Sequence, residues 1–285
     1  MTSPLQPVRP PLRPYRIDAW IQHPTPRLLA DPMLAPLLRW LGSKVPDELP
    51  AAFTLAALDF AKVDHAIASA WYGPGGPLIS NDEVAAFCKL APHRLTGLCG
   101  VDLRRPMAAL AELDRCTGEL GMKGLRLLPW LWELPPDDRR LYPLYARLCQ
   151  LELPLCLQVG HTGPLAPSEF GRPIPYLERV ALDFPELTIV AGHIGAPWTD
   201  EMIFLARKFD NVHIDTSAYR PSRFPATLVE FMKSKRGRHR VLFASNHPMV
   251  MPASCLSELG ALDLDDETTA LYLGENARRV FGLAL

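Results

Sequence analysis

Residues 155–216 decide the fold, and they read LCLQVGHTGPLAPSEFGRPIPYLERVALDFPELTIVAGHIGAPWTDEMIFLARKFDNVHIDT. Three short apolar runs, at 155–159, 188–191 and 212–216, are separated by segments with the spacing of amphipathic helices. Strands that alternate with helices of about 10–15 residues indicate βαβ units, in which each helix returns the chain so that successive strands run parallel. This stretch therefore predicts a parallel sheet covered by helices.

The same alternation extends over the rest of the chain. We expect strands at 15–21, 63–70, 94–101, 123–128, 155–159, 188–191, 212–216 and 241–244. Helices are expected near 82–91, 106–120, 138–151, 173–184, 200–209, 225–235 and 265–280, with a longer helical connection over 24–62. Eight βα units in 285 residues predict an α/β fold, a single-domain (β/α)8 TIM barrel over 15–285. A doubly wound nucleotide-binding sheet is disfavoured, because the chain has neither GxGxxG after its first strand nor GxxxxGK[ST] anywhere.

Composition limits the classes of partner. The formal net charge is −1, so the chain lacks the basic excess typical of nucleic-acid binding. No apolar run approaches the ~18 residues that a membrane span needs, and we expect no membrane partner. The six cysteines are scattered without a CxxC pair, which predicts reduced thiols and a cytoplasmic location. Five prolines in residues 1–14 predict an extended Pro-rich N-terminal arm.

Polar side chains gather where the predicted strands end. In a (β/α)8 barrel the active site lies at this carboxyl end, because the βα loops begin there. Four of the eight histidines fall at these positions, and their joint placement around one rim predicts a site for a small-molecule substrate. In strand order, the candidates are Asp18, Trp20, Gln22, His23, Arg126, Gln158, His161, His193, Asp215, Thr216, Asn246 and His247.

Residues 159–202, VGHTGPLAPSEFGRPIPYLERVALDFPELTIVAGHIGAPWTDEM, resemble the amidohydrolase-related barrel proteins. These are the relatives of aminocarboxymuconate-semialdehyde decarboxylase and of the metal-dependent aromatic-acid decarboxylases. The segments NVHIDTSAY at 211–219, RVLFASNHPM at 240–249 and ENARRVFGL at 275–283 fit the same pattern. The resemblance is strong from about residue 120 onward. It implies a (β/α)8 fold and chemistry on small carboxylates, lactones or amides.

The resemblance also implies a metal site, from which this sequence departs. Family members carry Asp-x-His-x-His on strand one, a His on strand five, a His on strand six and an Asp after strand eight. Alternate residues of a strand face the same way, so both imidazoles of such a pair reach one ion. Here Trp20, Gln22, Gln158 and Asn246 occupy ligand positions, and only His193 keeps its place.

Trp cannot ligate a metal, and neutral amides are poor Zn²⁺ ligands. We therefore predict a chain with no metal and no other cofactor. One alternative keeps a Zn²⁺ or another divalent ion at a shifted site. That site would be built from His23, His161 and His193, with Asp18 or Asp215 behind them.

Hydrolysis without an ion needs a general base for water and a group that stabilises the oxyanion. A histidine with a pKa near 7 suits the base, and we expect His193 to act as acid or base with His161 assisting and Asp18 in the catalytic group. Arg126 is expected to bind a substrate carboxylate or stabilise the oxyanion, and Trp20 to form an apolar wall. The other substrate-binding candidates are Gln22, His23, Gln158, Asp215, Asn246 and His247. The predicted function is lactone or amide hydrolysis of a small cyclic or aromatic carboxylate.

Other interpretations stay open from the sequence. Arg126 also fits a structural ion pair with Asp102. Trp130 and Trp132 could line the pocket or cover it from outside, and lining is favoured because their loop is on the active face. The chain also fits a metal-dependent decarboxylase or hydrolase with shifted ligands, a rearranging enzyme, or a non-catalytic barrel that binds a small molecule. Apolar surface in 24–62 and around Trp198 predicts a homodimer.

Overall fold

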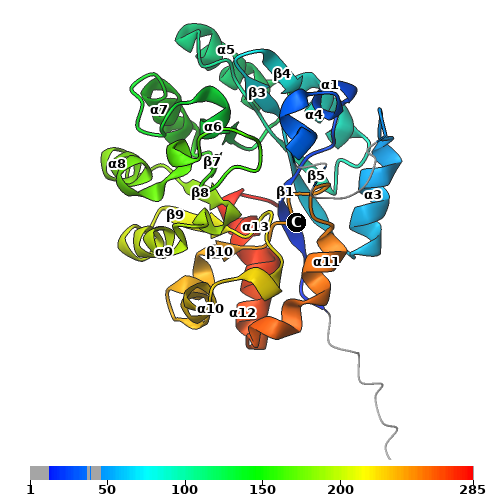
Figure 1. The fold of residues 1–285 in the computed structure, drawn as a ribbon, viewed down its shortest axis with the longest axis vertical. Coiled ribbons are helices and arrows are strands. Elements are labelled where there is room, and N and C mark those ends of the chain that lie inside the picture. The colour runs from blue at the N-terminus through cyan, green and yellow to red at the C-terminus, as the bar shows by residue number, and fades with distance from the viewer. Residues whose placement is uncertain (1–12, 37–38, 40–45, 285) are drawn as a thin grey trace, which may run out of the picture.

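The computed structural model describes residues 13–36, 39 and 46–284. Most of the Pro-rich arm expected over 1–14 lies outside the described residues, as do parts of the 24–62 connection. The described chain forms a ring of parallel strands surrounded by helices (Figure 1). The predicted (β/α)8 barrel is confirmed.

Eight parallel strands close the barrel. They form two hydrogen-bonded sheets, β1-β2-β5 and β10-β9-β8-β7-β6. A bridge between Cys99 and Leu125 joins β5 to β6, and a bridge between Ile21 and His247 joins the first and last strands. The strands are β1 (Ile17–Ile21), β2 (His65–Ser69), β5 (Leu95–Leu98), β6 (Leu125–Leu127), β7 (Leu155–Gln158), β8 (Ile189–Gly192), β9 (Val212–Asp215) and β10 (Val241–Leu242). Each overlaps an expected strand.

The strands are apolar because both of their faces are buried. Every residue of β1, β7, β8 and β9 is buried, as expected when helices cover one face and the barrel interior holds the other. Trp20 of β1 points into this interior and is fully buried. A Cβ at Gly192 of β8 would lie 2.3 Å from the Trp20 ring, so glycine is required there for the indole to fit.

The helices surround the barrel and connect successive strands. They are α1 (Pro26–Leu29), α3 (Ala51–Phe60), α4 (Asn81–Lys89), α5 (Pro106–Gly118), α6 (Pro129–Trp132), α7 (Tyr142–Leu151), α8 (Glu178–Asp183), α9 (Thr199–Lys208), α10 (Ala226–Lys233), α11 (Pro252–Ser257), α12 (Asp266–Ala270) and α13 (Asn276–Val280). The helix expected over 173–184 begins with an irregular turn, because Pro173 and Pro175 cannot donate backbone hydrogen bonds. In the described part of the chain, no helix is long and apolar enough to span a membrane.

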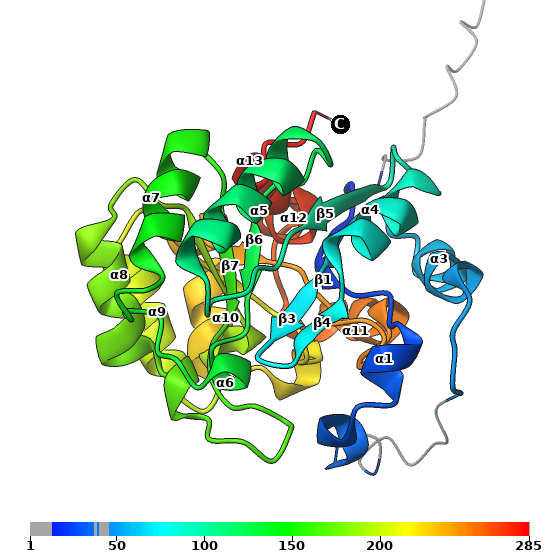
Figure 2. The ribbon, with the colours of Figure 1, turned by 90° about the horizontal axis from the view of Figure 1, so that it is seen from above.

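Three elements near the carboxyl ends of the strands were not predicted. They are the hairpin of β3 (Trp71–Gly73) and β4 (Gly76–Ile79), and the short helices α6 and α11. Figure 2 shows the hairpin, α1 and α6 at one end of the barrel, with α12 and α13 toward the other. These additions build walls above the strand ends.

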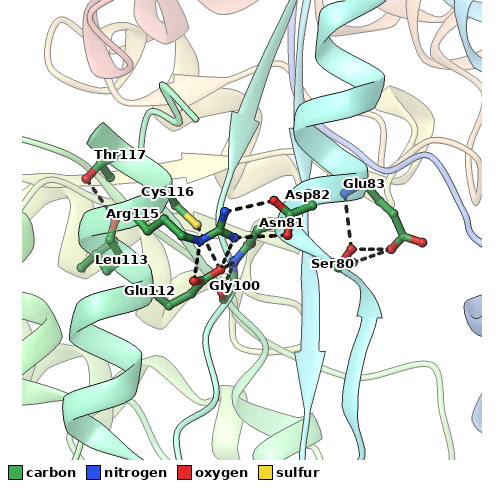
Figure 3. Close-up of polar contacts among 10 residues, drawn as sticks. All are labelled: Ser80, Asn81, Asp82, Glu83, Gly100, Glu112, Leu113, Arg115, Cys116 and Thr117. Carbon is green, nitrogen blue, oxygen red and sulfur yellow. Dashed lines mark hydrogen bonds and ion pairs between the residues drawn. The ribbon is translucent and has the colours of Figure 1, made fainter. Parts of the chain in front are cut away.

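A buried polar network fixes the second and third βα units (Figure 3). The Asn81 amide donates to the Gly100 carbonyl oxygen at 2.9 Å and to Glu112 Oε1 at 2.7 Å, and it accepts from the Gly100 amide at 2.9 Å. Arg115 links Glu112 on α5 to Asp82 on α4, at 2.8 and 3.0 Å. The network therefore holds α4, α5 and the chain after β5 in one position, and so supports the β3–β4 wall.

Candidate active site

A cavity of about 720 Å³ opens at the carboxyl ends of the strands. Its size suits a small cyclic or aromatic ligand. No Asp, Glu, Lys or Arg side chain is among the described residues that line it. The apolar lining includes Leu28, Leu34, Phe53, Trp71, Trp130, Tyr219, Met249 and Val250, and the polar lining is Gln22, Gln158, His161, Thr162, His193 and Asn246.

Trp20 is fully buried beside two residues of the cavity lining, His193 and Gln22, and is not itself among the described lining residues, so it does not form the apolar wall expected from the sequence. The Arg126 guanidinium carbon lies 3.5 Å from the centroid of the Trp20 ring, and the His193 ring lies 4.7 Å from it. The Trp20 indole donates to Gln22 Oε1 at 2.9 Å. Gln22 in turn donates to Asn246 Oδ1 at 3.0 Å, which fixes both amides. The cavity floor is therefore a connected set of rings and amides.

His193 is held by a short relay. Ser217 donates its hydroxyl hydrogen to Asp215 Oδ1, so the Ser217 oxygen accepts from the His193 backbone amide at 3.2 Å and from its Nδ1 at 2.6 Å. This network places the proton on Nδ1 and leaves the lone pair on Nε2. Because Nδ1 turns toward Ser217 and His193 lines the cavity, Nε2 is the ring nitrogen on the cavity side.

The turn that carries His193 has unusual backbone angles. His193 has φ of 62° and Ile194 has φ of 50°, in the left-handed region that non-glycine residues rarely occupy. Asn246, on the loop after β10, has φ of 67°. Such conformations cost about 1–3 kcal/mol each and gather at functional sites. Two polar residues of the cavity are thus presented by strained turns.

Burial controls the protonation of His193. Removal from water lowers its pKa to about 3, with smaller contributions from Arg126 and His161. The imidazole is therefore neutral near pH 7 and is a weaker base than the histidine of pKa near 7 expected from the sequence. Its conjugate acid is correspondingly strong, which favours rapid return of a proton.

Two carboxylates lie behind Trp20 and do not line the cavity. Asp18 Oδ1 accepts from the backbone amides of Trp20 and Ser245, at 3.2 and 2.9 Å. Burial raises the Asp18 pKa to about 7, and the nearby charge of Asp215 adds to this. Burial also raises the Asp215 pKa, while Arg126 opposes the shift. In the described region, Asp18 Oδ2, Asp215 Oδ2 and both Arg126 Nη atoms lack hydrogen-bond partners.

Several predicted site residues meet at the cavity. Gln22, Gln158, His161, His193 and Asn246 all line it. The Gln158 side chain is oriented by two bonds, because it accepts from Trp130 Nε1 at 2.7 Å and donates to the His161 carbonyl oxygen at 3.2 Å. The neighbouring Trp130 lines the cavity, as favoured from the sequence.

Other predicted residues lie elsewhere. His23 contacts Thr54 Oγ1 at 3.0 Å and stacks on Phe87, and His247 is buried against Phe53. Arg126 lies under Trp20 with 3% of its surface exposed and is not among the lining residues, so the floor separates it from a ligand.

Two structural interpretations from the sequence also need correction. Asp102 pairs with Arg104 at 2.6 Å, so it is not the partner of Arg126. Trp132 packs on the outer side of the barrel with Leu103 and Tyr145, whereas Trp130 faces the cavity.

Sequence reasoning missed some residues of the site. Ser217 was not singled out, although it follows the noted Asp215 by two positions in the turn after β9. Phe53, Trp71 and Tyr219 reach the cavity from the first connection, the β3–β4 hairpin and the loop after β9. No spacing signal marks these three, because their placement depends on loop conformation.

The described side chains at the cavity do not form a donor set for a metal ion. Within the described residues, no group of three or more His, Cys, Asp and Glu side chains is arranged to hold an ion. The shifted site of His23, His161 and His193 is therefore not assembled there. The described side chains do not fit a bound metal.

Comparison with known proteins places the chain in context. Among curated relatives, a 2-keto-4-carboxy-3-hexenedioate hydratase of Sphingobium sp. is 29% identical over 136 residues, 40% of this chain and 39% of the relative. The decarboxylase orsB of Emericella nidulans is 25% identical over 58% of this chain and 56% of the relative. The matches thus span about two fifths to just over half of these relatives.

Solved structures share the fold. An uncharacterised TIM-barrel protein of Bordetella bronchiseptica has a TM-score of 0.80 at 23% identity, covering 94% of this chain and 98% of that one. A 5-carboxyvanillate decarboxylase of Novosphingobium aromaticivorans with manganese has a TM-score of 0.70 at 19% identity, covering 94% and 96%. A probable 2-pyrone-4,6-dicarboxylic acid hydrolase of Acinetobacter baumannii with bound citric acid has a TM-score of 0.67 at 16% identity, covering 94% and 99%.

The manganese in similar structures contradicts one prediction. Two structures similar to this chain, the 5-carboxyvanillate decarboxylase and a dihydroxybenzoic acid decarboxylase of Polaromonas sp., contain manganese. They point to a divalent metal as a cofactor among these proteins, so the prediction of no cofactor is wrong. Its physical basis was the loss of ligands at four positions, which describes this sequence and not its relatives.

The family itself follows from a direct match. Residues 17–283 match the model of the family described as Amidohydrolase, which covers the whole barrel from β1 to the residues after α13. Four of the similar proteins named above are, by their names, a hydratase, a hydrolase or decarboxylases. The chain therefore belongs to the amidohydrolase family.

Proposed function

We propose that this protein is a hydrolase of a small cyclic or aromatic carboxylate, with a lactone or amide bond opened beside His193. The observation that supports this most is the Asp215–Ser217–His193 relay. It fixes the tautomer of the imidazole, which burial keeps neutral, so that the Nε2 lone pair is on the cavity side. A neutral, oriented imidazole is the form that accepts a proton from water.

Asn246 supplies the complementary group. Its Oδ1 accepts from Gln22, so its Nδ2 hydrogens are left for other acceptors, and the residue lines the cavity. In the proposed reaction, water attacks the carbonyl carbon and passes its proton to His193 Nε2. The negative charge on the carbonyl oxygen is stabilised by Asn246 Nδ2. The carbon–oxygen or carbon–nitrogen bond then breaks, and His193 returns the proton to the leaving group.

The walls of the cavity favour a planar ring. Trp71, Trp130, Phe53 and Tyr219 line it, and aromatic side chains bind rings through offset stacking and edge contacts worth about 0.5–1.5 kcal/mol each. The similarity to a probable hydrolase of a pyrone dicarboxylate agrees with this class of substrate. Decarboxylation is less favoured, because it needs an acid for the ring carbon and no carboxyl group is among the described lining residues.

A paired variant experiment tests the proposal. Wild type and His193→Gln are each incubated with two substrates, the lactone 2-pyrone-4,6-dicarboxylate and a hydroxybenzoate. Each incubation is done with and without added Mn²⁺. We expect ring opening by wild type and a loss of at least ~100-fold in His193→Gln. His93→Gln is the matched control, because His93 is exposed and lies outside the cavity. Equal rates for wild type and His193→Gln, or carbon dioxide as the product, would contradict the proposal.

A further inference from the structure

The Gln22 side chain is held between a group that can only donate and a group that can only accept. The Trp20 indole N–H donates to Gln22 Oε1 at 2.9 Å. Gln22 Nε2 donates to the Asn246 backbone carbonyl oxygen at 3.2 Å. An indole nitrogen carries no acceptor and a carbonyl oxygen carries no hydrogen, so the two contacts fix the direction of the Gln22 amide independently.

The direction of the Gln22 amide determines that of Asn246. Gln22 Nε2 also donates to Asn246 Oδ1 at 3.0 Å, so Oδ1 faces Gln22 and Nδ2 faces away from it. Among the described residues, Asn246 Nδ2 has no hydrogen-bond partner, and it is not one of the unpartnered atoms that are closed off from solvent. Because Asn246 lines the cavity, its Nδ2 hydrogens are open to a ligand there.

The other asparagines of the chain are bonded differently. The sequence contains four, and all four lie in the part that the structure describes. In Asn81, Asn211 and Asn276, Nδ2 contacts two acceptor oxygens of the protein, at 2.7–3.2 Å. Their side-chain hydrogens are therefore used within the fold, whereas those of Asn246 are kept for a ligand.

The fold keeps Trp20, Gln22 and Asn246 in register. Trp20 is fully buried, and a Cβ at Gly192 would lie 2.3 Å from its ring, so the indole is closely packed. The Asn246 backbone amide donates to the Trp20 carbonyl oxygen, and the Gln22 amide donates to the His247 carbonyl oxygen, both at 2.9 Å. These contacts hold the end of β1 against the loop after β10, so the amide directions are set before a ligand arrives.

We infer that Gln22 is a positioning residue that keeps Asn246 a hydrogen-bond donor, so that the site selects rings carrying a carbonyl oxygen. The inference rests on the proposed function for the role of Asn246 in the reaction, whereas the direction of its amide follows from the contacts alone. A donor that is oriented before binding loses little freedom when it meets an acceptor. A ligand with a hydrogen-bond donor at the same place would leave Asn246 Nδ2 unpaired.

Nitrogen-15 labelling of asparagine tests the direction of the Asn246 amide in wild type. The probes are 1-indanone and indane, which differ by one carbonyl oxygen and cannot be hydrolysed. We expect 1-indanone, and not indane, to shift the Asn246 side-chain signal, which is identified by its loss in Asn246→Asp. The signals of Asn81, Asn211 and Asn276 should stay in place. Calorimetry should show at least about threefold tighter binding of 1-indanone. Equal responses and equal affinities for the two probes would overturn the inference.

Two matched variants test the role of Gln22. Gln22→Met and Gln158→Met each remove an amide that is held between an indole N–H and a backbone carbonyl oxygen, but only Gln22 bonds Asn246. We expect the shift of the Asn246 signal with 1-indanone to persist in Gln158→Met and to be lost in Gln22→Met. Its persistence in Gln22→Met, or an equal loss in both variants, would overturn the inference.

Trp20→Phe is a milder variant that keeps the packing of a ring. It removes the indole donor but leaves the bond from Gln22 to the Asn246 carbonyl oxygen, so the preference for 1-indanone should lie between those of wild type and Gln22→Met. A preference equal to that of wild type would contradict a role for the indole in setting the amide direction.

Turnover separates this inference from the proposed function. With 2-pyrone-4,6-dicarboxylate, Gln22→Met should lower kcat more than it raises KM, because the oriented Asn246 donor acts on the oxyanion. An Asn246 signal that responds as expected together with an unchanged kcat would remove the oxyanion role from Asn246, and the positioning role of Gln22 would stand.

Discussion

Ser217→Ala removes the centre of the relay that orients His193. The Ser217 hydroxyl donates to Asp215 and accepts from His193 Nδ1 at 2.6 Å, and all three residues are buried. Alanine fits the same space without the oxygen, so the variant loses hydrogen bonds and little packing. His193 then has a buried Nδ1 donor without a partner, and Asp215 loses the hydroxyl hydrogen bond while it keeps the bond from the Ser217 backbone amide, at 3.0 Å.

The cost follows from these two losses. A buried donor left unpaired costs about 1–3 kcal/mol, and a hydrogen bond to a charged group contributes about 1.5–3 kcal/mol. Both losses come from one hydroxyl, and water in the vacated space recovers part of them. We therefore expect the free energy of unfolding to fall by about 3 kcal/mol. We also expect the imidazole to lose its fixed tautomer, which should lower turnover by about 10–100-fold, as for other residues that orient a functional imidazole.

Ser245→Ala is the matched control. Ser245 is a fully buried serine on the neighbouring strand end, and it bonds Asp18 and the His247 backbone amide instead of His193. Urea denaturation should show a similar loss of stability in both variants. Nitrogen-15 spectra of labelled histidine and turnover assays should show a change in His193 only for Ser217→Ala. Equal behaviour of the two variants in all three measurements would refute the relay.

The remaining predictions concern the barrel interior and pH. Trp20→Phe should lower the free energy of unfolding by about 1 kcal/mol, because the hydrogen bond to Gln22 is lost. Trp20→Ala should lower it by about 3–5 kcal/mol, because it also leaves a cavity. If thermal or urea unfolding gave the same loss for both variants, this prediction would be contradicted. The raised Asp18 pKa, about 7, means that the folded chain holds a proton that the unfolded chain releases near pH 4, so stability is lost as pH rises from 4 to 7. Asp18→Asn should therefore gain stability relative to wild type over that interval, by up to roughly 4 kcal/mol, and an unchanged difference between pH 4 and pH 8 would count against it. Burial lowers the His213 pKa to about 3, so between about pH 6.5 and pH 3 this imidazole is protonated in the unfolded chain and neutral in the folded one. The free energy of unfolding therefore falls by about 1.4 kcal/mol for each unit that the pH is lowered in this range. His213→Asn should remove that slope, and an unaltered acid limb in urea titrations would show that His213 does not contribute to it.

The fold was predictable because its signal is repeated. The barrel strands are short, mostly apolar and almost entirely buried, and the helical spacing between them leaves little freedom in topology. The β3–β4 hairpin was not predicted because its strands have only three and four residues and include Pro77 and two glycines, Gly73 and Gly76. Such a segment has no periodicity to detect.

The site was predictable in part. Residues at strand ends, such as Gln22, Gln158 and His193, reach the cavity because the barrel fixes where strands end. His23 and Arg126 do not reach it. His23 turns to Thr54 and Phe87, and the Trp20 ring covers Arg126. These outcomes depend on side-chain packing between distant segments, which spacing along one sequence does not encode.

Ring opening in water labelled with oxygen-18 tests the role of His193 most directly. Wild type and His193→Gln are incubated with 2-pyrone-4,6-dicarboxylate, and the products are analysed by mass spectrometry. Attack of water on the carbonyl carbon predicts one oxygen-18 atom in the new carboxylate for wild type. Transfer of the water proton to His193 Nε2 predicts at least ~100-fold less product for His193→Gln. Unlabelled product, loss of carbon dioxide, or an equal rate in His193→Gln would contradict the account.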